Sequence, residues 1–355
     1  MTSALLTLAD LGWRPVFQQQ LSLDELSNGR PARVTAVHRD RLEWLDETGA
    51  HSWMISGAFR HAEAEDRPTL GDWLWLDAVS GEPQRLLQRQ TLLRRTASGS
   101  EPKPQLIAAN LDTLLIVASC NADFNLSRLE RYLALALDAG VDPVIVLTKA
   151  DLSADADALR DQAQSLRSDL PVVCLDARQS WSVDALSPWL MRGQSLALVG
   201  SSGVGKTTLT NSLIGEARYA TAAIREDDAK GRHTTTQRQM ERTPLGAWIM
   251  DTPGMRELRL GEATEGVSAL FDDIEALAQQ CRFGDCSHQG DAGCAIEAAV
   301  ASSELDARRL RSYQKLQRET AQASETKWQQ RRRHKAFSKM AKRVVQDQQR
   351  AKKTD

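Results

Sequence analysis

Hydrophobic residues are spaced differently in successive parts of this chain. Between residues 31 and 95, short apolar runs are bounded by turn residues, a pattern that predicts closely spaced β-strands. Between residues 105 and 262, continuous apolar runs alternate with helical patterns, which predicts a parallel sheet covered by helices on both faces. From residue 263 to 326 the pattern is helical and polar. Residues 1–30 show only weak periodicity, so they are set apart as a segment whose order the pattern leaves open.

The strands expected in the first of these regions cover residues 32–37, 41–45, 52–56 and 72–77. Short strands that follow one another this closely are typical of a small barrel of the oligonucleotide/oligosaccharide-binding type. A stretch rich in Ser, Gly, Pro and charged residues at 96–104 then predicts a linker or loop.

Tryptophans are frequent in and beside these strands, at Trp44, Trp53, Trp73 and Trp75. Such side chains most often fill the core of a small barrel, and we favour that interpretation. The alternative is that they lie on the surface as platforms on which nucleic-acid bases stack.

In the α/β region, strands are expected at 111–118, 143–147, 171–175 and 195–199. Helical patterns at 126–139 and 155–167 separate the first three of these strands. The predicted fold class is therefore α/β, with an all-β domain before it and a helical domain after it.

The composition is that of an ordinary globular protein, with 355 residues, 41% hydrophobic and 26% charged. This length allows two or three domains. No apolar run approaches the roughly 20 residues of a membrane-spanning helix, and the N-terminus lacks the features of an export signal. We therefore expect the protein in the cytoplasm.

Charge is distributed unevenly along the chain. Residues 327–355 contain 11 Lys and Arg against two acidic residues, so this tail carries +9 and the remainder −11. A basic tail on an acidic body indicates contact with a polyanion, and a solvated helical tail is the alternative.

The strongest chemical signal is the run Gly200-Ser201-Ser202-Gly203-Val204-Gly205-Lys206-Thr207, with Thr208 next in a helical pattern. It matches the phosphate-loop pattern in full and lies between an apolar strand and a helix, as that loop requires. The glycines let backbone N–H groups converge on phosphates at a helix N-terminus. Lys206 is expected to bind the β- and γ-phosphates, and the Thr207 hydroxyl to bind Mg²⁺.

Two later segments are expected to complete the phosphate end of the site. Asp251-Thr252-Pro253-Gly254 follows an apolar strand, so that Asp251 can hold Mg²⁺ and the Gly254 N–H can bind the γ-phosphate. The loop 231–236 offers Thr234 as a further Mg²⁺ ligand, with Thr235 as its alternative. An ordinary turn and an ordinary polar loop are the competing interpretations.

The run Thr148-Lys149-Ala150-Asp151 indicates a guanine base. Guanine-binding domains usually have Asn-Lys-x-Asp here, and the Asp carboxylate accepts hydrogen bonds from guanine N1–H and its 2-amino group. Adenine offers neither donor, so it would leave a buried carboxylate unpaired. Lys149 is expected to pack along the base. Thr148 replaces the usual Asn, which we expect to weaken nucleotide affinity.

Asp176-Ala177, at the end of the strand 171–175, is a second base-recognition candidate. The Ala177 N–H can bind guanine O6, and Asp176 stands where Ser is usual. Both base motifs precede the phosphate loop, the reverse of the ordinary order, and a parallel sheet with nearby ends permits such a circular permutation. The switch loops then adjoin the C-terminal helical region, to which we expect the nucleotide state to be passed.

A compact cluster of Cys281, Cys286, His288 and Cys294 lies in that helical region. Three thiolates and an imidazole suit a closed tetrahedral zinc site without an open position for catalysis. Charged neighbours argue against the alternative of unrelated buried cysteines. The odd total of five cysteines also fits a metal site in a reduced protein better than a disulfide framework.

Together these motifs resemble the bacterial circularly permuted GTPases that depend on the small ribosomal subunit and act late in its maturation. The resemblance covers most of the chain. It implies an oligonucleotide-binding-type barrel at 31–95, a permuted GTPase domain at 105–262 and a zinc-binding helical domain at 263–326, followed by the basic tail 327–355. It also implies that the two flanking domains contact ribosomal RNA.

The resemblance further implies slow intrinsic hydrolysis that the subunit stimulates. Met255 follows the Asp-Thr-Pro-Gly run, at a place where many signalling GTPases have a Gln that orients the attacking water. His233 is then the candidate to orient or activate water, and a structural role is its alternative.

The sequence thus predicts a monomeric GTP hydrolase that matures the small ribosomal subunit and uses Mg²⁺ with GTP and one Zn²⁺ per chain. One alternative is a GTP-gated RNA-binding factor that acts on another RNA and uses hydrolysis only as a release timer. Another is an ATPase or nucleotide kinase, in which the match at 148–151 is a coincidence.

Overall fold

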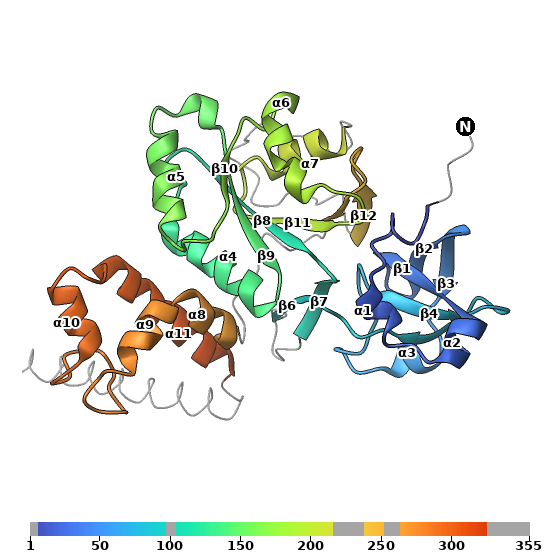
Figure 1. Ribbon diagram of the computed structural model, residues 1–355, viewed down its shortest axis with the longest axis horizontal. Coiled ribbons are helices and arrows are strands. Elements are labelled where there is room, and N and C mark those ends of the chain that lie inside the picture. Colours follow the sequence, from blue (N-terminus) through green and yellow to red (C-terminus); the bar gives the residue numbers. More distant parts are fainter. Residues whose placement is uncertain (1–5, 97–103, 216–237, 252–262, 325–355) are drawn as a thin grey trace, which may run out of the picture.

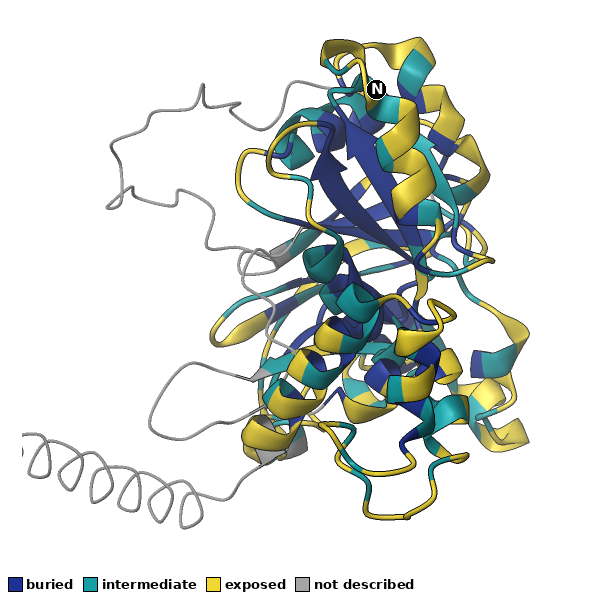
Figure 2. Cartoon of the chain, turned by 90° about the vertical axis from the view of Figure 1, so that its left-hand side faces the viewer, coloured by how far each residue is buried: buried dark blue, intermediate teal, exposed yellow. Residues whose placement is uncertain are grey.

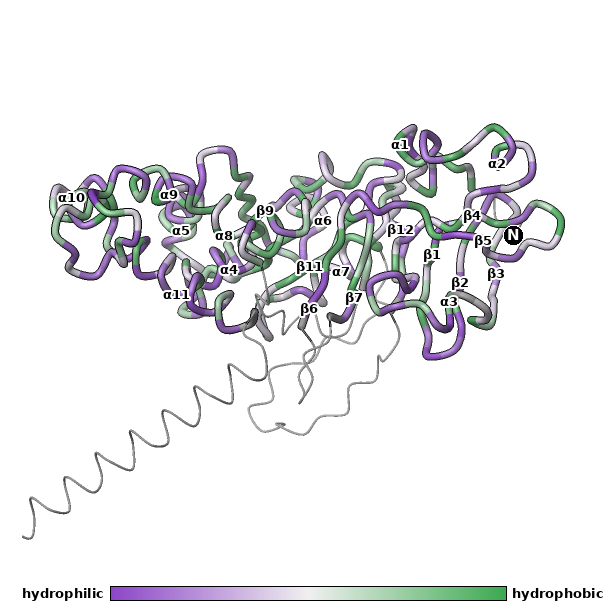
Figure 3. Tube along the Cα trace, turned by 90° about the horizontal axis from the view of Figure 1, so that it is seen from below, coloured by the Kyte–Doolittle hydropathy of each residue, from purple (hydrophilic) through white to green (hydrophobic). Residues whose placement is uncertain are grey.

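The computed structural model describes residues 6–96, 104–215, 238–251 and 263–324 (Figure 1). The predicted sites at 231–236, with His233 and Thr234, at Gly254 and in the basic tail lie outside these residues. In the view of Figure 1 the N-terminal β region, the α/β region and the helical region follow one another along the long axis, and Figure 3 shows the same order from below. Within the described residues, no helix is long and apolar enough to cross a bilayer.

The central sheet confirms the predicted α/β class. Its α/β part runs in the order β10 (Val172–Cys174), β9 (Asp142–Thr148), β8 (Thr113–Ser119), β11 (Ser195–Val199), β13 (Trp248–Asp251) and β12 (Arg238–Arg242). The first five strands are parallel to their neighbours, and β12 is antiparallel to β13. The carboxyl ends of the parallel strands therefore meet at one edge of the sheet, where loops that bind ligands are usually found.

Helices cover both faces of this sheet because its strands are apolar on both sides. Along β8, Ile116 packs in one hydrophobic cluster and its neighbours Leu115 and Val117 pack in another on the opposite face. The helices of this region are α4 (Leu126–Asp138), α5 (Ala156–Gln164), α6 (Ser180–Val183), the 3₁₀ helix η2 (Asp184–Trp189) and α7 (Lys206–Ile214). Figure 2 shows the strands buried and the helices exposed on their outer sides.

The N-terminal region is built from antiparallel strands, as its pattern predicts. They are β1 (Gly29–Val37), β2 (Arg41–Asp46), β3 (Gly49–Met54), β4 (Trp73–Asp77) and β5 (Pro83–Leu86), with α3 (Gly57–His61) between β3 and β4. Strand β1 pairs with β2 and β4, and its end also pairs with β12. The β region is therefore hydrogen-bonded directly to the α/β sheet, which the sequence did not predict.

The tryptophans of this region are mainly core residues. Trp44, Trp73 and Trp75 are each no more than 4% exposed, in agreement with the favoured interpretation. Trp53 is half-buried, with its ring edge-on to Phe59 at a centroid distance of 6.0 Å. Three of the four rings are therefore unavailable for base stacking.

A ribbon of two strands follows the β region. It consists of β6 (Leu92–Thr96) and β7 (Pro104–Ala109), which pair antiparallel. The expected linker at 96–104 therefore begins and ends in this ribbon. Its central residues 97–103 lie outside the described part of the chain.

The N-terminal segment packs on the rest of the protein from residue 6 onward. It contains α1 (Pro15–Gln18) and α2 (Leu23–Asn28), and it buries Leu11 and Phe17 in the main core. The Asp10 carboxylate accepts hydrogen bonds from Arg192 and Arg242 of the α/β region at 2.7–2.8 Å. These contacts tie the segment to the α/β domain.

The C-terminal region is helical, as predicted, with α8 (Thr264–Leu270), α9 (Asp272–Ala278), α10 (Ala295–Ala301) and α11 (Ala307–Ser324). Helix α8 crosses α4 so closely that a Cβ on Gly266 would collide with the Ala134 carbonyl oxygen. The helical region is thus seated on a helix of the α/β domain.

Candidate functional site

The base motif and the phosphate loop meet at the carboxyl edge of the parallel sheet. Strand β9 leads into residues 148–151, and β11 leads into residues 200–207. Strand β8 lies between them and pairs with both. Motifs that the chain presents in permuted order are therefore only two strands apart in space.

Glycines shape the phosphate loop where other residues would not fit. Gly200 has φ 144°, and a Cβ there would collide with the Val117 carbonyl oxygen of β8. Gly205 has φ 93° and is the N-cap of α7. Because its N-cap carries no side chain, the first turn of α7 keeps its N–H groups for an anion, which the positive end of the helix dipole also favours.

Lys206 begins α7 and folds back over the loop. Its ammonium donates hydrogen bonds to the carbonyl oxygens of Gly200, at 2.7 Å, and Ser201. Thr207 and Thr208 follow in the first turn and are half-buried. The loop thus gathers backbone N–H groups, an ammonium and hydroxyls, the groups that bind a polyphosphate.

Thr148 joins the base motif to the phosphate loop. Its side chain is buried, and its hydroxyl lies 2.6 Å from the Val204 carbonyl oxygen and 3.2 Å from that of Ala118. A Cβ on Gly205 would lie only 3.4 Å from this hydroxyl. Thr148 stands where Asn is usual, and its hydroxyl still makes a contact with the phosphate loop.

Lys149 makes the second link between the two motifs. Its backbone is left-handed, with φ 58°, which turns the chain sharply out of β9. Its ammonium donates to the Gly203 carbonyl oxygen at 2.9 Å. The turn leads into the 3₁₀ helix η1 (Ala150–Leu152), which carries Asp151.

Arg178 holds together the acidic residues of the two candidate base-recognition loops. It donates to Asp151 at 2.7 Å and to both carboxylate oxygens of Asp176 at 2.9 and 3.0 Å. These bonds from Arg178 lower the pKa of Asp176 below the usual value. Arg178 was not among the site residues expected from the sequence, although its position directly after Ala177 was a usable signal.

Ala177 is held in place by a contact with α7. The Ser212 hydroxyl of α7 donates to its carbonyl oxygen at 2.6 Å. The second base-recognition candidate is therefore tied to the helix that begins at Lys206.

Of the residues expected to hold Mg²⁺, the structure describes Thr207 fully and Asp251 by its backbone. Asp251 ends β13, whose Met250 is paired with Ala197 of β11. The end of β13 therefore lies on the same edge as the phosphate loop. Thr234 lies outside the described residues.

The Cys/His cluster assembles as its spacing predicts. The ligand atoms of Cys281, Cys286, His288 and Cys294 all lie within 4.8 Å of one another. His288 Nδ1 is 3.6 Å from the Cys281 sulfur and 3.5 Å from the Cys294 sulfur. Four converging donors, three sulfurs and one imidazole nitrogen, can hold one metal ion.

Polar contacts around the cluster hold its ligands in place. Desolvation opposes ionisation of Cys281, but hydrogen bonds from the backbone N–H groups of Ala295 and Ile296, together with those from Cys286 and Cys294, outweigh it and lower its pKa. The Asp291 carboxylate accepts from Ser287 N and Oγ at 2.9 and 2.7 Å. The backbone N–H groups at the start of α10 favour the thiolate form of Cys281, and Asp291 holds the loop between the ligands in place. Both features support metal binding.

A sequence model described as RsgA GTPase matches residues 86–261. Another, described as ABC transporter, matches residues 183–352, a range that includes the phosphate loop.

Relatives match nearly the whole chain. The Small ribosomal subunit biogenesis GTPase RsgA 2 of Vibrio vulnificus is 49% identical over 98% of both chains. The Small ribosomal subunit biogenesis GTPase RsgA of Mesorhizobium japonicum is 47% identical over 89% of this chain and 90% of its own.

Two crystal structures show the same fold. YjeQ from Thermotoga maritima matches 82% of this chain and 99% of its own, with a TM-score of 0.61 and 23% identity. YloQ, described as a circularly permuted GTPase, matches 84% of this chain and 97% of its own, with a TM-score of 0.58 and 21% identity. With a permuted GTPase fold and relatives that span its length, this chain belongs to the RsgA GTPase family.

Proposed function

We propose that this protein hydrolyses GTP as a late maturation factor of the small ribosomal subunit, with hydrolysis stimulated by that subunit. The observation that carries the proposal is that Thr148 and Lys149 hydrogen-bond to carbonyl oxygens of the phosphate loop. These contacts place the candidate base-binding motif beside the candidate phosphate-binding motif. The relatives named small ribosomal subunit biogenesis GTPases supply the partner.

Guanine is the base that the site favours. The Asp151 carboxylate can accept from guanine N1–H and the 2-amino group, and the Ala177 N–H can donate to O6. Adenine offers this carboxylate no donor, so the hydrogen bonds between Asp151 and the base would be lost. Arg178 must share Asp151 with the base or give it up, since it occupies one carboxylate oxygen.

Residues Gly200 to Thr208 would bind the phosphates. Lys206 would move its ammonium from the loop carbonyls onto the β- and γ-phosphates, and the first turn of α7 would donate backbone N–H groups. Thr207, Thr234 and Asp251 would hold Mg²⁺, which offsets phosphate charge. Gly254 would bind the γ-phosphate.

For the attacking water, we propose His233 as the orienting group. Met255 has no group that can hydrogen-bond strongly to water, whereas an imidazole can accept its proton. Placement of His233 by the subunit would explain why the subunit stimulates hydrolysis.

The Cys281, Cys286, His288 and Cys294 cluster would hold one Zn²⁺, whose role is to fix the fold of the helical domain. We propose that this domain, the β domain and the basic tail contact ribosomal RNA in the cytoplasm, and that the protein acts as a monomer. Contacts of Lys and Arg with phosphates would make binding fall steeply with salt.

The test is GTP turnover measured alone, with purified small subunits and with large subunits. We expect stimulation by small subunits only, and competition of GDP but not ADP for the site. Equal stimulation by both subunits, or none, would contradict the proposed role. Preference for ADP would contradict the base assignment.

A further inference from the structure

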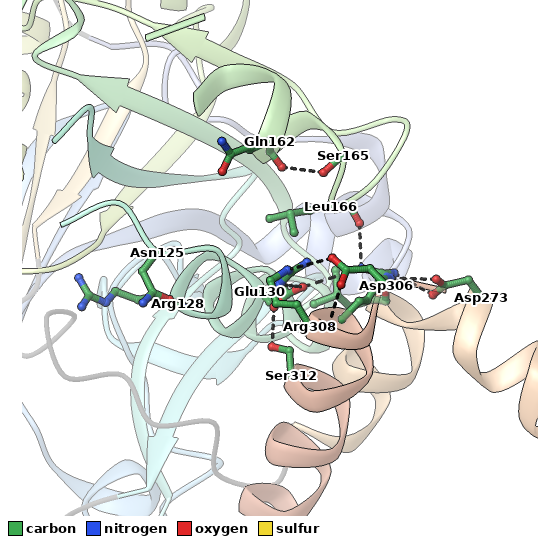
Figure 4. Close-up of polar contacts among 12 residues, drawn as sticks. Asn125, Arg128, Glu130, Gln162, Ser165, Leu166, Asp273, Asp306, Arg308 and Ser312 are labelled. Atoms are coloured by element: carbon green, nitrogen blue, oxygen red, sulfur yellow. Dashed lines mark hydrogen bonds and ion pairs between the residues drawn. The ribbon is translucent and has the colours of Figure 1, made fainter. Parts of the chain in front are cut away.

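Helix α4 connects the phosphate loop to the helical metal-binding domain through side chains on its first two turns. Asn125 caps the helix by accepting from the Arg128 N–H at 3.0 Å. The Arg128 guanidinium donates to the Ser201 hydroxyl of the phosphate loop at 2.5 Å. Figure 4 shows Asn125 and Arg128 at one end of α4 and Glu130 facing the C-terminal helices.

Glu130, two residues further along α4, is buried without exposure to solvent. Arg308 of α11 reaches both of its oxygens at 3.0 and 3.1 Å, and the Ser312 hydroxyl donates to it as well (Figure 4). Arg309 adds a longer ion pair at 3.9 Å. Removing the partners of a buried carboxylate is strongly destabilising, so α4 and α11 are expected to move together.

Arg131, the next residue, donates to Glu319 of α11 at 2.7 Å. Helix α11 reaches the metal cluster in turn, because the Gln314 amide donates to the His288 carbonyl oxygen at 3.1 Å. A continuous series of contacts thus runs from His288 through α11 and α4 to Ser201.

We propose that α4 couples the helical domain to the phosphate loop of this GTPase. In this proposal Arg128 is a positioning residue, through which a change in the position of the helical domain alters the phosphate loop. This route does not run through the switch loops expected at residues 231–236 and 251–254. A partner that shifts the helical domain would carry α11, and α4 with it, because Glu130 cannot be left unpaired. Arg128 would then change how firmly Ser201 and its loop are held.

The inference rests on the proposed function, because it concerns stimulation by the small subunit. The experiment compares turnover with and without small subunits for the wild type, Arg128→Ala, Arg128→Lys and Ser201→Ala, and for the double variant Arg128→Ala/Ser201→Ala. Arg160→Ala is the matched control, since Arg160 lies on exposed α5 and pairs only with its neighbours Asp157 and Asp161 among the ion pairs described.

We expect Arg128→Ala to lower the ratio of stimulated to basal turnover by about tenfold, a usual size for coupling between sites. Lysine should restore part of it, and the double variant should have the same ratio as Ser201→Ala. An unchanged ratio in Arg128→Ala, or additive losses in the double variant, would overturn the coupling role. If the wild type itself is not stimulated, the proposed function fails, which is a distinguishable outcome.

A second measurement needs no ribosome. Because coupling is reciprocal, GDP binding should slow amide hydrogen exchange in residues 307–324 of the wild type, at GDP concentrations that saturate every variant. Arg128→Ala should lose this protection and Arg160→Ala should keep it. Protection that is absent in the wild type, or equal in Arg128→Ala, would overturn the inference.

Discussion

The Thr148 hydroxyl lies 2.6 Å from the Val204 carbonyl oxygen, across 56 residues of sequence. This contact fixes the end of β9 to the phosphate loop, so base and phosphates can be bound at a set distance from each other. The permuted chain order does not prevent this contact, because β9, β8 and β11 lie side by side in the sheet.

Replacing Thr148 by Val should weaken nucleotide binding without unfolding the protein. Valine keeps the shape but removes the donor, so the buried Val204 carbonyl loses a partner at a cost of about 1–3 kcal/mol. We expect a rise of roughly five- to 150-fold in the dissociation constant for GDP, measured by equilibrium fluorescence titration. Thr148→Ser, which keeps the hydroxyl, should bind as the wild type does. Equal affinity of the Val variant would show that the contact is dispensable.

Replacing Asp151 by Asn should change the preferred base. The Asn amide can donate to the carbonyl that xanthine has at C2, whereas it repels the guanine 2-amino group. GTP turnover at low substrate should fall by on the order of a hundredfold, and turnover of xanthosine triphosphate should rise. Asp151→Ala is the control and should use neither nucleotide well. Retention of GTP preference in Asp151→Asn would remove this residue from base recognition.

Removal of the metal should loosen the helical domain locally. Chelation removes the ion, and Cys286→Ser removes one of its ligands, so residues 281–294 lose the centre that organises them, while α8 stays packed on α4. We expect one metal ion per chain by atomic emission, and faster hydrogen exchange over 281–301 once it is removed. Cys174→Ser, outside the cluster, should keep the full metal content. Unchanged exchange after complete metal loss would rule out a structural ion.

Acid should release the N-terminal segment through Asp10. Hydrogen bonds from Arg192, then from Thr7, hold the pKa of Asp10 well below its usual range. A carboxyl with a lowered folded-state pKa stabilises the protein above its unfolded pKa of about 3.9 and loses that contribution as pH falls further. Asp10→Asn should therefore cost about 1–3 kcal/mol at pH 7, and less as pH falls below 4.

Denaturant unfolding at pH 7 and at pH 3 measures this difference. Asp24→Asn, at an exposed carboxylate on α2, is the matched control and should change stability little at either pH. A cost of Asp10→Asn that does not shrink at pH 3 would show that the loss comes from packing and not from the carboxylate charge.

Much of this protein was determined by its sequence alone. The phosphate loop, the run 148–151 and the Cys/His cluster are local patterns, because each ligand set lies within a few residues and its chemistry dictates the spacing. The apolar runs of β8, β9 and β11 likewise predicted a sheet covered on both faces, since burial of both faces removes polar residues from a strand.

Only the tertiary structure decided which distant side chains meet. Arg128 meets Ser201, Arg178 meets Asp151, and Glu130 meets Arg308 because helix packing and strand register bring them together. A charged residue on a helix usually faces solvent, so periodicity gives no sign that Glu130 is buried. Whether two polar side chains pair depends on where the fold places them. The spacing of hydrophobic residues along the chain indicates only which apolar side chains are buried.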